Sequence, residues 1–418
     1  MEFVELTAEE FIAYAPSHPH FSFLQCEGAI KLKTLRGWQN EFVGIKDKGE
    51  IIAAAFLTSI PQLRGLYRYY YAQGGLLIDY TQPKLVEYMI RHIKRYCHKR
   101  RGLYVRFDPN VYLVERDIDG CPIEGGFDNH YMIENMKKMG CLYCGEVTKL
   151  DDILQPRWQF VLDLKNKTKQ QILKEMDQQT RWSINKTLKF GIEVKFFTKE
   201  QLPVFKQIME HTSQRRGFED HELSYYEDMM EAYGDKIRIP YAELDAVKYE
   251  KKMQEQLKQA EQDLEEVNQL LEQQPNSKKF TKRQKVCVEA VETALKRLQE
   301  AKDLKQQYPE PIILATALYL FGDDREMLYL FSGAYEEFMH FNGPYAIQWA
   351  MIQMALEMGF ERYNFYGISG NFSEDADDYG VYLFKKGFNG RVEERVGDFI
   401  LPVSNLTFKF YNRLKKVV

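Results

Sequence analysis

The sequence predicts an α/β protein with mixed sheets (α+β) and an antiparallel helical hairpin inserted in its second half. Short apolar runs rich in β-branched residues alternate with runs of helical periodicity in both halves of the chain. Residues 246–305 interrupt this alternation with apolar residues at spacings of four and three. At 418 residues, of which 44% are hydrophobic, the chain is long enough for two domains with separate cores.

The first half is expected to hold a strand pair, a helix and a further strand. The turn sequence Asp47-Lys48-Gly49 separates the paired strands, and Pro83 suits the first position of the helix. Asp108-Pro109 follows the last strand. The expected elements are strands 42–45 and 51–58, helix 83–100 and strand 103–107.

The second half repeats this alternation, so we expect two similar α/β domains. Gly191 is a suitable left-handed cap for a basic helix, and Gly322-Asp323-Asp324 joins two strands. The expected elements are strand 159–164, helix 169–190, strand 192–197, helical residues 202–233, two strands within 312–334, helix 343–359 and strand 362–366.

The interruption has the pattern of a coiled-coil hairpin. Its first arm carries the seam Met253, Leu257, Ala260, Leu264, Val267 and Leu271. Pro275-Asn276-Ser277 marks the turn, and the second arm resumes the spacing at Val288, Val291, Leu295 and Leu298. Arms of about two dozen residues, at 1.5 Å per residue, give a hairpin roughly 35 Å long.

Two basic clusters are candidate contacts for an RNA backbone. The first lies around the expected hairpin tip and comprises Lys278, Lys279, Lys282, Arg283 and Lys285. The second is a stripe on helix 169–190 that includes Arg181. For both clusters a merely solvated surface is the alternative interpretation.

Composition and missing motifs exclude several classes. A net charge of −4 excludes a globally cationic nucleic-acid binder, so any RNA contact must be local. No P-loop, dinucleotide fingerprint or nucleophile elbow occurs. Cys141-Leu-Tyr-Cys144 lacks a second ligand pair for zinc, so no metal site and no cofactor is expected. Scattered cysteines, with no leader-like start and no apolar run of roughly 20 residues, predict a cytoplasmic protein with free thiols.

The segment 362–399 is the most informative part of the chain. A strand is expected to end at Tyr366-Gly367, and an acidic loop then leads to Phe384-Lys385. A lysine between Phe384 and Phe388 is partly desolvated and could stabilise a developing oxyanion. The alternative is a surface lysine flanked by core aromatics. A last strand reaching Gly397-Asp398-Phe399 is expected to close the sheet.

This segment resembles the C-terminal signature of the Fem family of non-ribosomal aminoacyltransferases. The family's tyrosine-glycine turn, its phenylalanine-lysine step before a Gly-Phe and its Gly-Asp-Phe strand all have counterparts here. The resemblance extends through the chain, at His20-Phe21, Gln25, Lys33, Gly37, Val43-Gly-Ile-Lys46, Gly75, Asp79-Tyr80, Leu103, Asp108-Pro109 and Leu162-Asp-Leu-Lys165. The hairpin lies where the FemA-like branch carries its coiled coil.

The resemblance implies two tandem acetyltransferase-like (GNAT) domains with the hairpin in the second. We therefore expect a first domain of residues 1–150, with 396–418 returning to it, and a second domain of 151–245 and 306–395. The implied activity is transfer of an amino acid from aminoacyl-tRNA, without a cofactor, to the stem-peptide or growing-bridge amine of a peptidoglycan precursor, usually lipid II. Glycine fits the FemA-like branch best, and alanine or serine are alternatives.

Matching positions imply roles for individual residues. Lys33 and Arg215 match positions expected to hold the precursor diphosphate, with Lys31 and Arg216 as neighbouring alternatives. Lys385, with Phe384 beside it, and Asp108 match positions tied to catalysis. Tyr366 and Gly367 are expected to line the channel, although core packing is an equal alternative for Tyr366, and Asp108 before a proline could simply form a turn.

The implied partners are aminoacyl-tRNA, the precursor, the inner face of the cytoplasmic membrane, and either a sister Fem-type transferase or a second copy of the chain. Two rivals remain. An acyl-CoA-dependent N-acyltransferase would share the fold, but its Gly-rich pyrophosphate loop is absent. A non-enzymatic coiled-coil adaptor would require degenerate domains.

Overall fold

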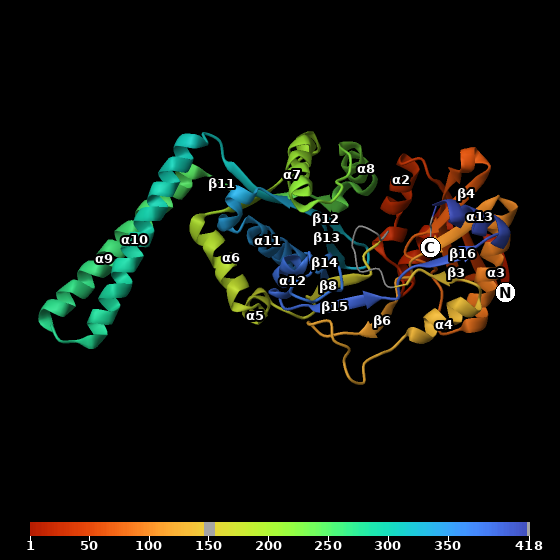
Figure 1. The fold of residues 1–418 in the computed structure, drawn as a ribbon, viewed down its shortest axis with the longest axis horizontal. Helices are drawn as coiled ribbons and strands as arrows, with labels where there is room; N and C mark the ends of the chain where they lie inside the picture. Colours follow the sequence, from red (N-terminus) through yellow and green to blue (C-terminus); the bar gives the residue numbers. More distant parts are fainter. Residues whose placement is uncertain (146–154, 416–418) are drawn as a thin grey trace.

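A computed structural model describes residues 1–145 and 155–415. It contains two mixed sheets side by side, each covered by helices, and a long helical hairpin that projects from the second (Figure 1). The predicted mixed α/β fold is confirmed. The predicted domain boundary between residues 150 and 151, and the chain end at 416–418, lie outside the described residues.

The first sheet has the strand order β1-β2-β3-β4-β5-β16-β7. Its strands are β1 Glu2–Glu5, β2 Gln39–Asp47, β3 Glu50–Gln62, β4 Tyr67–Ala72, β5 Gly102–Phe107, β7 Leu142–Tyr143 and β16 Phe399–Pro402. Helices α3 (Pro83–Lys99) and α4 (His130–Lys138) share a core with one face, while α1 (Ala8–Tyr14) and α2 (Glu27–Leu35) pack on the other. Alternation along β3 makes both faces apolar, since Ala55 and Leu57 enter one core and Phe56 enters the other.

The second sheet has the order β6-β15-β8-β14-β13-β12-β11-β9, with β10 beside β12. Its strands are β6 Tyr112–Glu115, β8 Trp158–Asp163, β9 Glu193–Phe196, β10 Ile237–Arg238, β11 Pro240–Leu244, β12 Ile312–Phe321, β13 Glu326–Ala334, β14 Arg362–Ile368 and β15 Arg391–Arg395. Its helices are α5 Lys169–Glu175, α6 Gln178–Phe190, α7 Leu202–Arg216, α8 Leu223–Tyr233, α11 Gly343–Glu357 and α12 Tyr379–Lys386. Short 3₁₀ turns occur in both halves of the chain: η1 Ala15–Ser17, η2 Phe23–Gln25, η3 Leu63–Gly65, η5 Lys199–Gln201, η6 Gly234–Lys236 and η7 Glu336–Phe341.

One apolar core belongs to both sheets. It combines Phe11 and Phe56 from the first sheet and its helices with Phe205, Tyr226 and Leu318 from the second sheet and its helices. Helices α2 and α8 meet there so closely that a Cβ on Gly28 would clash with the ring of Tyr233. The two sheets and their helices are therefore joined by buried side chains.

Two strands cross between the halves of the sequence. β16, near the chain end, lies between β5 and β7 in the first sheet. β6, from the first half, pairs with β15 in the second sheet. The three residues 396–398 link the two sheets and are not in a strand, so the prediction of one strand reaching Gly397-Asp398-Phe399 is wrong.

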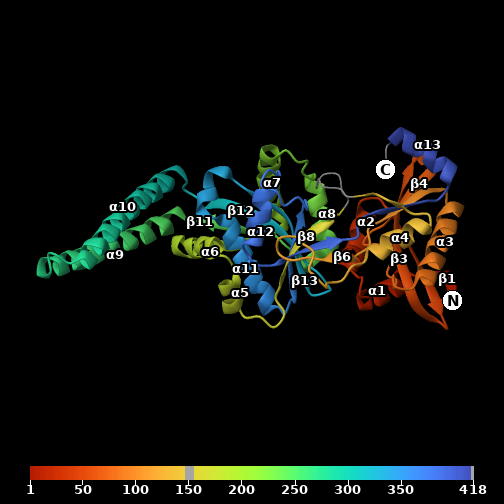
Figure 2. The ribbon, with the colours of Figure 1, turned by 60° about the horizontal axis from the view of Figure 1, so that its bottom comes forward.

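The hairpin consists of α9 (Ala246–Gln273) and α10 (Lys278–Gln307), which lie side by side in both ribbon views (Figures 1 and 2). The predicted seam of α9 is buried or half-buried at every position. On α10 the prediction is wrong at Val288 and Leu295, which are 39% and 50% exposed. The inward positions are Cys287, Val291, Ala294, Leu298 and Ala301.

Two long helices expected from the sequence are each broken in the structure. The expected helix 169–190 is divided because Met176 is extended (ψ 155°) and Asp177 begins a new helix by accepting from the Thr180 N–H at 2.6 Å. The expected helical stretch 202–233 ends its first helix at Gly217, which has φ +75°. The predicted cap at Gly191 is confirmed, with φ +74°. Among the described residues, no helix has the length and apolarity that crossing a bilayer requires.

Candidate functional site

Lys385 lies in the last turn of α12, and its side chain is buried. The residue is 4% exposed, and its Nζ donates to the carbonyl oxygen of Gly367 at 2.6 Å and, at 3.4 Å, to that of Tyr366. Within the described residues it forms no ion pair. Burial lowers the pKa of Lys385 from 10.5 to about 7, and Asp378 only partly opposes this shift. The amine can therefore both hold and release a proton near neutral pH.

The carbonyls that hold Lys385 belong to a left-handed turn in β14. Tyr366 has φ +61°, and the pairing of β14 with β8 shifts register between Asn364 and Gly367. The fully buried Asn364 stabilises this turn, because its Oδ1 accepts the Tyr366 N–H at 2.7 Å. Its Nδ2 donates to Gln159 at 2.8 Å and to Glu326 at 3.2 Å.

Tyr366 packs against the apolar core that both sheets share. Its hydroxyl donates to Gln155 at 2.5 Å, and its ring contacts Phe23 of the first domain with 6.1 Å between centroids. Burial raises the pKa of Tyr366, the charge of Arg395 lowers it, and the charge of Asp108 raises it. The expected position of Tyr366 beside a channel stays a prediction.

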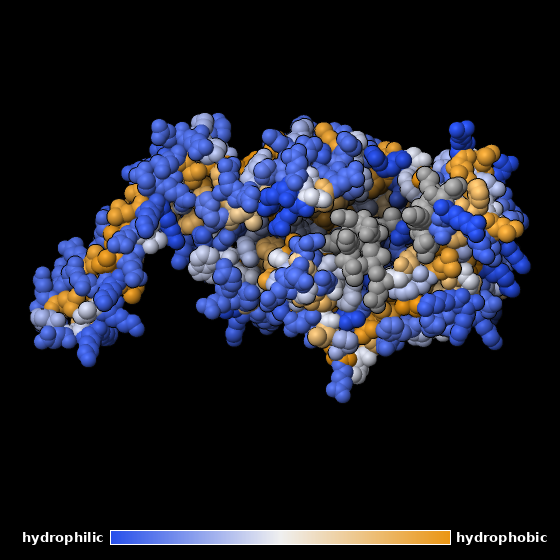
Figure 3. Space-filling model, viewed as in Figure 1, coloured by the Kyte–Doolittle hydropathy of each residue, from blue (hydrophilic) through white to orange (hydrophobic). Residues whose placement is uncertain are grey.

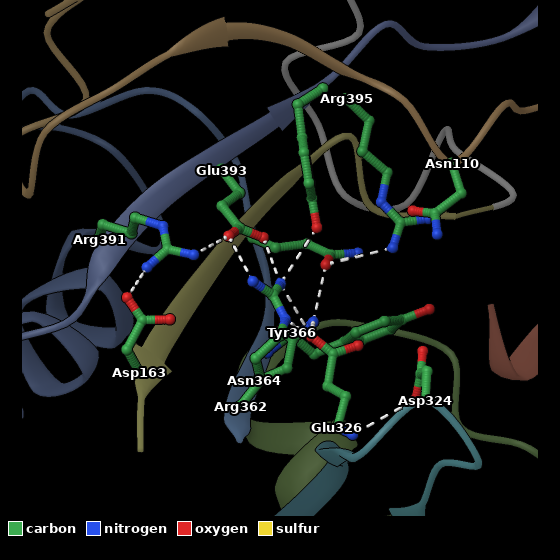
Figure 4. Close-up of polar contacts among 12 residues, drawn as sticks. Asn110, Asp163, Asp324, Glu326, Arg362, Asn364, Tyr366, Arg391, Glu393 and Arg395 are labelled. Carbon is green, nitrogen blue, oxygen red and sulfur yellow. Dashed lines mark hydrogen bonds and ion pairs between the residues drawn. The ribbon is translucent and has the colours of Figure 1, made fainter. Parts of the chain in front are cut away.

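A largely buried charged network surrounds this turn (Figure 4). Arg362 pairs with Glu326 at 3.0 Å and with Glu393 at 2.7 Å. The guanidinium of Arg395 approaches Gln159, the partner of Asn364, at 3.5 Å. These contacts cross β8, β13, β14 and β15, so the turn is anchored to four strands of the sheet.

Asp108 follows β5 and is 6% exposed. It accepts from the Gly74 N–H at 2.9 Å and from the Tyr71 hydroxyl at 3.0 Å. Burial, followed by the nearby charge of Asp398, raises its pKa to about 8. A carboxyl group with this pKa is matched to accept a proton from an ammonium group.

Lys33 shares the environment of Asp108. Its Nζ lies 4.3 Å from the ring centroid of Trp38 and 5.4 Å from that of Tyr71, the tyrosine that donates to Asp108. Burial lowers the pKa of Lys33 to about 8, and Asp108 partly opposes this. The first domain thus brings one cation and one carboxyl group together on either side of Tyr71.

Arg215 lies elsewhere, in the last turn of α7. It lines a cavity of about 680 Å³ in the second domain, and its buried Nε has no hydrogen-bond partner among the described residues. Arg216 lines the same cavity, so both arginines remain candidates. Asp378 lies between the cavity and Lys385. It lines the cavity, and its negative charge partly offsets the lowering of the Lys385 pKa by burial.

The structure therefore brings the predicted residues together in two groups. Lys33 and Asp108 form one group in the first domain, and Arg215 and Lys385 border one region of the second. Tyr366 and Gly367 lie between them. Phe384 is half-buried and packs its ring on Tyr345 and Phe388, with centroids 4.9 and 5.5 Å away.

The RNA-contact candidates differ in whether their side chains are exposed or already hydrogen-bonded. Those at the hairpin tip, Lys278, Lys279, Lys282, Arg283 and Lys285, are all exposed. Arg181 instead donates to the carbonyl oxygens of Lys174 and Met176 and so caps α5. Its guanidinium is already engaged, which leaves it less available to a phosphate than the tip residues.

Sequence reasoning missed Tyr71 and Asn364. Tyr71 is one tyrosine in the run Tyr69-Tyr70-Tyr71, and nothing in that run marks which ring faces Asp108. Asn364 is an asparagine inside an apolar strand, which is a signal for a special backbone position and could have been used. Among the described residues no group of histidine, cysteine and acidic side chains could hold a metal ion.

Two mixed sheets that share an apolar core, with a buried carboxyl group on the first sheet and a buried lysine beside the second, define a mixed α/β protein with two polar groups of candidate residues. Its sequence matches the model of the FemAB family over residues 6–416. It is 35% identical to the aminoacyltransferase FemA of Staphylococcus aureus (strain MW2), over 100% of this chain and 99% of that protein. The chain belongs to the FemAB family.

A solved structure shows the same fold. The crystal structure of FemX superposes with a TM-score of 0.76 and covers 99% of both chains at 22% sequence identity. The FemA sequence of strain N315 is likewise 35% identical over all 418 residues.

Proposed function

We propose that this protein is a tRNA-dependent aminoacyltransferase that builds the interpeptide bridge of peptidoglycan. Family membership and full-length similarity to an aminoacyltransferase support this proposal. The donor is an aminoacyl-tRNA, and the acceptor is the stem-peptide or growing-bridge amine of lipid II or a related precursor. Glycine is the expected amino acid, with alanine or serine as alternatives. The protein works in the cytoplasm and uses no cofactor.

The buried, carbonyl-held Lys385 is the observation that carries the proposal. Aminoacyl-tRNA is an activated ester, so the reaction needs no covalent enzyme intermediate. The acceptor nitrogen attacks the ester carbonyl, an N–C bond forms, and the C–O bond to the ribose breaks. Lys385 stabilises the tetrahedral oxyanion and gives the departing ribose oxygen its proton. Asp108 accepts the first proton that the attacking ammonium loses. The second nitrogen proton, lost as the amide forms, goes to Lys385 and replaces the one given to the ribose oxygen.

Lys33 and Arg215 would together hold the diphosphate of the precursor. Neither forms an ion pair in the described part of the chain, although Asp108 lies near Lys33. A guanidinium binds a diphosphate in a bidentate manner, and an amine held between aromatic rings adds a second positive charge. Because they lie in different domains, the precursor would bridge the two sheets.

The finer fold belongs to this proposal as well. We infer two acetyltransferase-like domains and a coiled-coil packing of α9 on α10. The exposed cations of the hairpin tip would contact the tRNA backbone, which predicts a salt-dependent affinity.

The proposal is tested by incubating the protein with mixed charged tRNAs and lipid II and weighing the product. One added aminoacyl residue is expected. Affinity for coenzyme A without transfer from charged tRNA would instead identify an acyl-CoA-dependent enzyme. Lack of any transfer with hairpin-dependent partner capture would indicate an adaptor.

The roles of the two lysines separate kinetically. Lys385→Met should lower transfer by at least about a hundredfold with precursor binding unchanged. Lys33→Ala should raise the apparent precursor constant more than it lowers turnover. Near-normal turnover of Lys385→Met would exclude that lysine from the chemistry.

A further inference from the structure

The C-terminal helix α13 (Asn405–Lys415) has two apolar faces, and only one of them packs on the protein. Phe408 and Tyr411 are buried against β5. Leu406 and Phe410 point away from that core and are 83% and 64% exposed. A spacing of four places these two side chains next to each other on one side of the helix.

The turn η3 extends this apolar face. Leu63 and Leu66 are 37% and 60% exposed, and the Tyr411 hydroxyl donates to Gln62 at 3.0 Å, so the turn and the helix are neighbours. Leu63 and Arg64 both have positive φ, at 49° and 58°, a conformation that costs energy in residues with a side chain. Figure 3 shows apolar residues gathered over this end of the molecule.

Four basic residues border the apolar side chains, and no acidic residue is adjacent to them in the sequence. Arg64, Arg101, Lys409 and Arg413 are all exposed, and none forms an ion pair in the described part of the chain. The Arg68 N–H donates to the Arg101 carbonyl at 2.9 Å, which places Arg101 beside the base of the turn. Residues 51–78 and 399–418 contain neither Asp nor Glu. These two segments therefore carry only positive charge, although the whole chain carries −4.

We propose that this end of the first domain, formed by Leu63, Leu66, Leu406 and Phe410 with the four surrounding cations, docks on the surface of an anionic lipid bilayer. Exposed aliphatic and aromatic side chains bordered by lysine and arginine match the acyl boundary and the anionic head groups of a bilayer. A second copy of the chain fits less well, because a two-fold contact through this face would place these cations against themselves. Nucleic acid would leave the aliphatic side chains without a partner.

Docking would hold the enzyme at the surface where a lipid-linked acceptor is anchored. It goes beyond the proposed transfer reaction and does not depend on it, since none of these residues belongs to the Lys385 or Asp108 groups. A water-soluble acceptor that lacks the lipid should therefore be used equally well with or without docking.

Co-sedimentation with vesicles of phosphatidylglycerol and phosphatidylcholine tests the proposal. The protein should bind these vesicles, bind pure phosphatidylcholine vesicles more weakly, and dissociate as salt is raised. Leu406→Gln with Phe410→Gln should weaken binding by at least roughly tenfold. Arg64→Ser with Lys409→Ser should weaken binding only to the anionic vesicles. The matched control is Val286→Gln with Leu295→Gln on the hairpin, where 58% and 50% exposed apolar side chains should be replaceable without effect.

Three outcomes would overturn the proposal: no binding of the unaltered protein to anionic vesicles, equal binding by the Leu406/Phe410 variant, or conversion of a dimer to a monomer by that variant. The last result would assign the face to a second copy. Transfer to a lipid-free acceptor is measured on the same samples. This second assay distinguishes failure of membrane docking from failure of the proposed transfer reaction, because vesicle binding is measured independently of transfer.

Discussion

Asn364 determines the backbone on which Lys385 depends. Its Oδ1 accepts the Tyr366 N–H, and the left-handed turn that results directs the carbonyls of Tyr366 and Gly367 to the lysine amine. Asparagine suits this task because one amide can accept from the turn and donate to the strands beneath it. We therefore interpret Asn364 as a positioning residue for Lys385.

Asn364→Ala should lower turnover by roughly tenfold or more with little change in precursor affinity, because the amine loses its fixed carbonyl partners. Loss of this positioning should also shift the pH at which Lys385 becomes reactive toward an amine-modifying reagent. Mass spectrometry of the modified protein measures this shift. Glycine adopts positive φ without a Cβ penalty, so adding Tyr366→Gly should restore part of that reactivity. If the pH dependence of Lys385 reactivity is unchanged in Asn364→Ala, Asn364 has only a structural role.

Burial of Lys385 should cost stability. Its pKa is about 7 in the folded protein and 10.5 when exposed, so the charged form is disfavoured by folding. The cost is complete below pH 7, where both states are charged, and fades as pH rises toward 10.5. Lys385→Met should therefore raise Tm by about 2 °C or more at pH 6 and by much less at pH 10. Calorimetry at both pH values measures this difference, and an equal or opposite change would contradict the assigned burial cost.

At the scale of elements, helix boundaries depended on single capping residues. Apolar periodicity continues across Met176 and across Gly217, so it predicted uninterrupted helices. Asp177 is a good N-cap and Gly217 a good left-handed cap, and both signals were present in the sequence. Periodicity alone could not show that the cap outweighs the continued apolar spacing.

Substitutions at two neighbouring residues of α10 test which side of this helix packs against α9. Ala294 is 7% exposed and faces α9, whereas Leu295 is 50% exposed. Ala294→Glu should destabilise the hairpin by about 2 kcal/mol or more, because it buries a charge between the helices. Leu295→Glu should be nearly neutral. Hydrogen exchange of the amides of α9 and α10 measures both, and a larger effect at Leu295 would restore the seam predicted from sequence.

At the scale of the whole molecule, the chain end completes the first sheet. β16 lies between β5 and β7, and Phe399, Ile400 and Leu401 are at most 1% exposed. Arg106 of β5 donates to Asp398, with Nε 2.8 Å from the carboxylate, and so ties the return of the chain to the strand that precedes Asp108.

Two truncations should separate the roles of β16 and α13. A chain ending at Val396 should lose the folded first domain, because the sheet is left without an inner strand. A chain ending at Ser404 should remain folded with a lower Tm, since it loses only the burial of Phe408 and Tyr411. Limited proteolysis with circular dichroism distinguishes them, and equal resistance of both would contradict the role of β16.

The sequence by itself determined the mixed α/β class, the hairpin and the family, because periodicity, turn residues and ordered motifs are properties of neighbouring residues. It also identified Lys385, Asp108, Lys33 and Arg215 as candidates, but not which of them lie together. That grouping depends on contacts between residues far apart in the chain.

Only the tertiary structure decided that Tyr71 stands between Lys33 and Asp108, that β6 and β16 each pair with strands from the opposite half of the sequence, and that Lys385 is buried on backbone carbonyls. The physical reason is that burial, and with it the pKa of each group, is set by what packs around a side chain. Local sequence states which side chain is present, and the fold decides how much water and charge surrounds it.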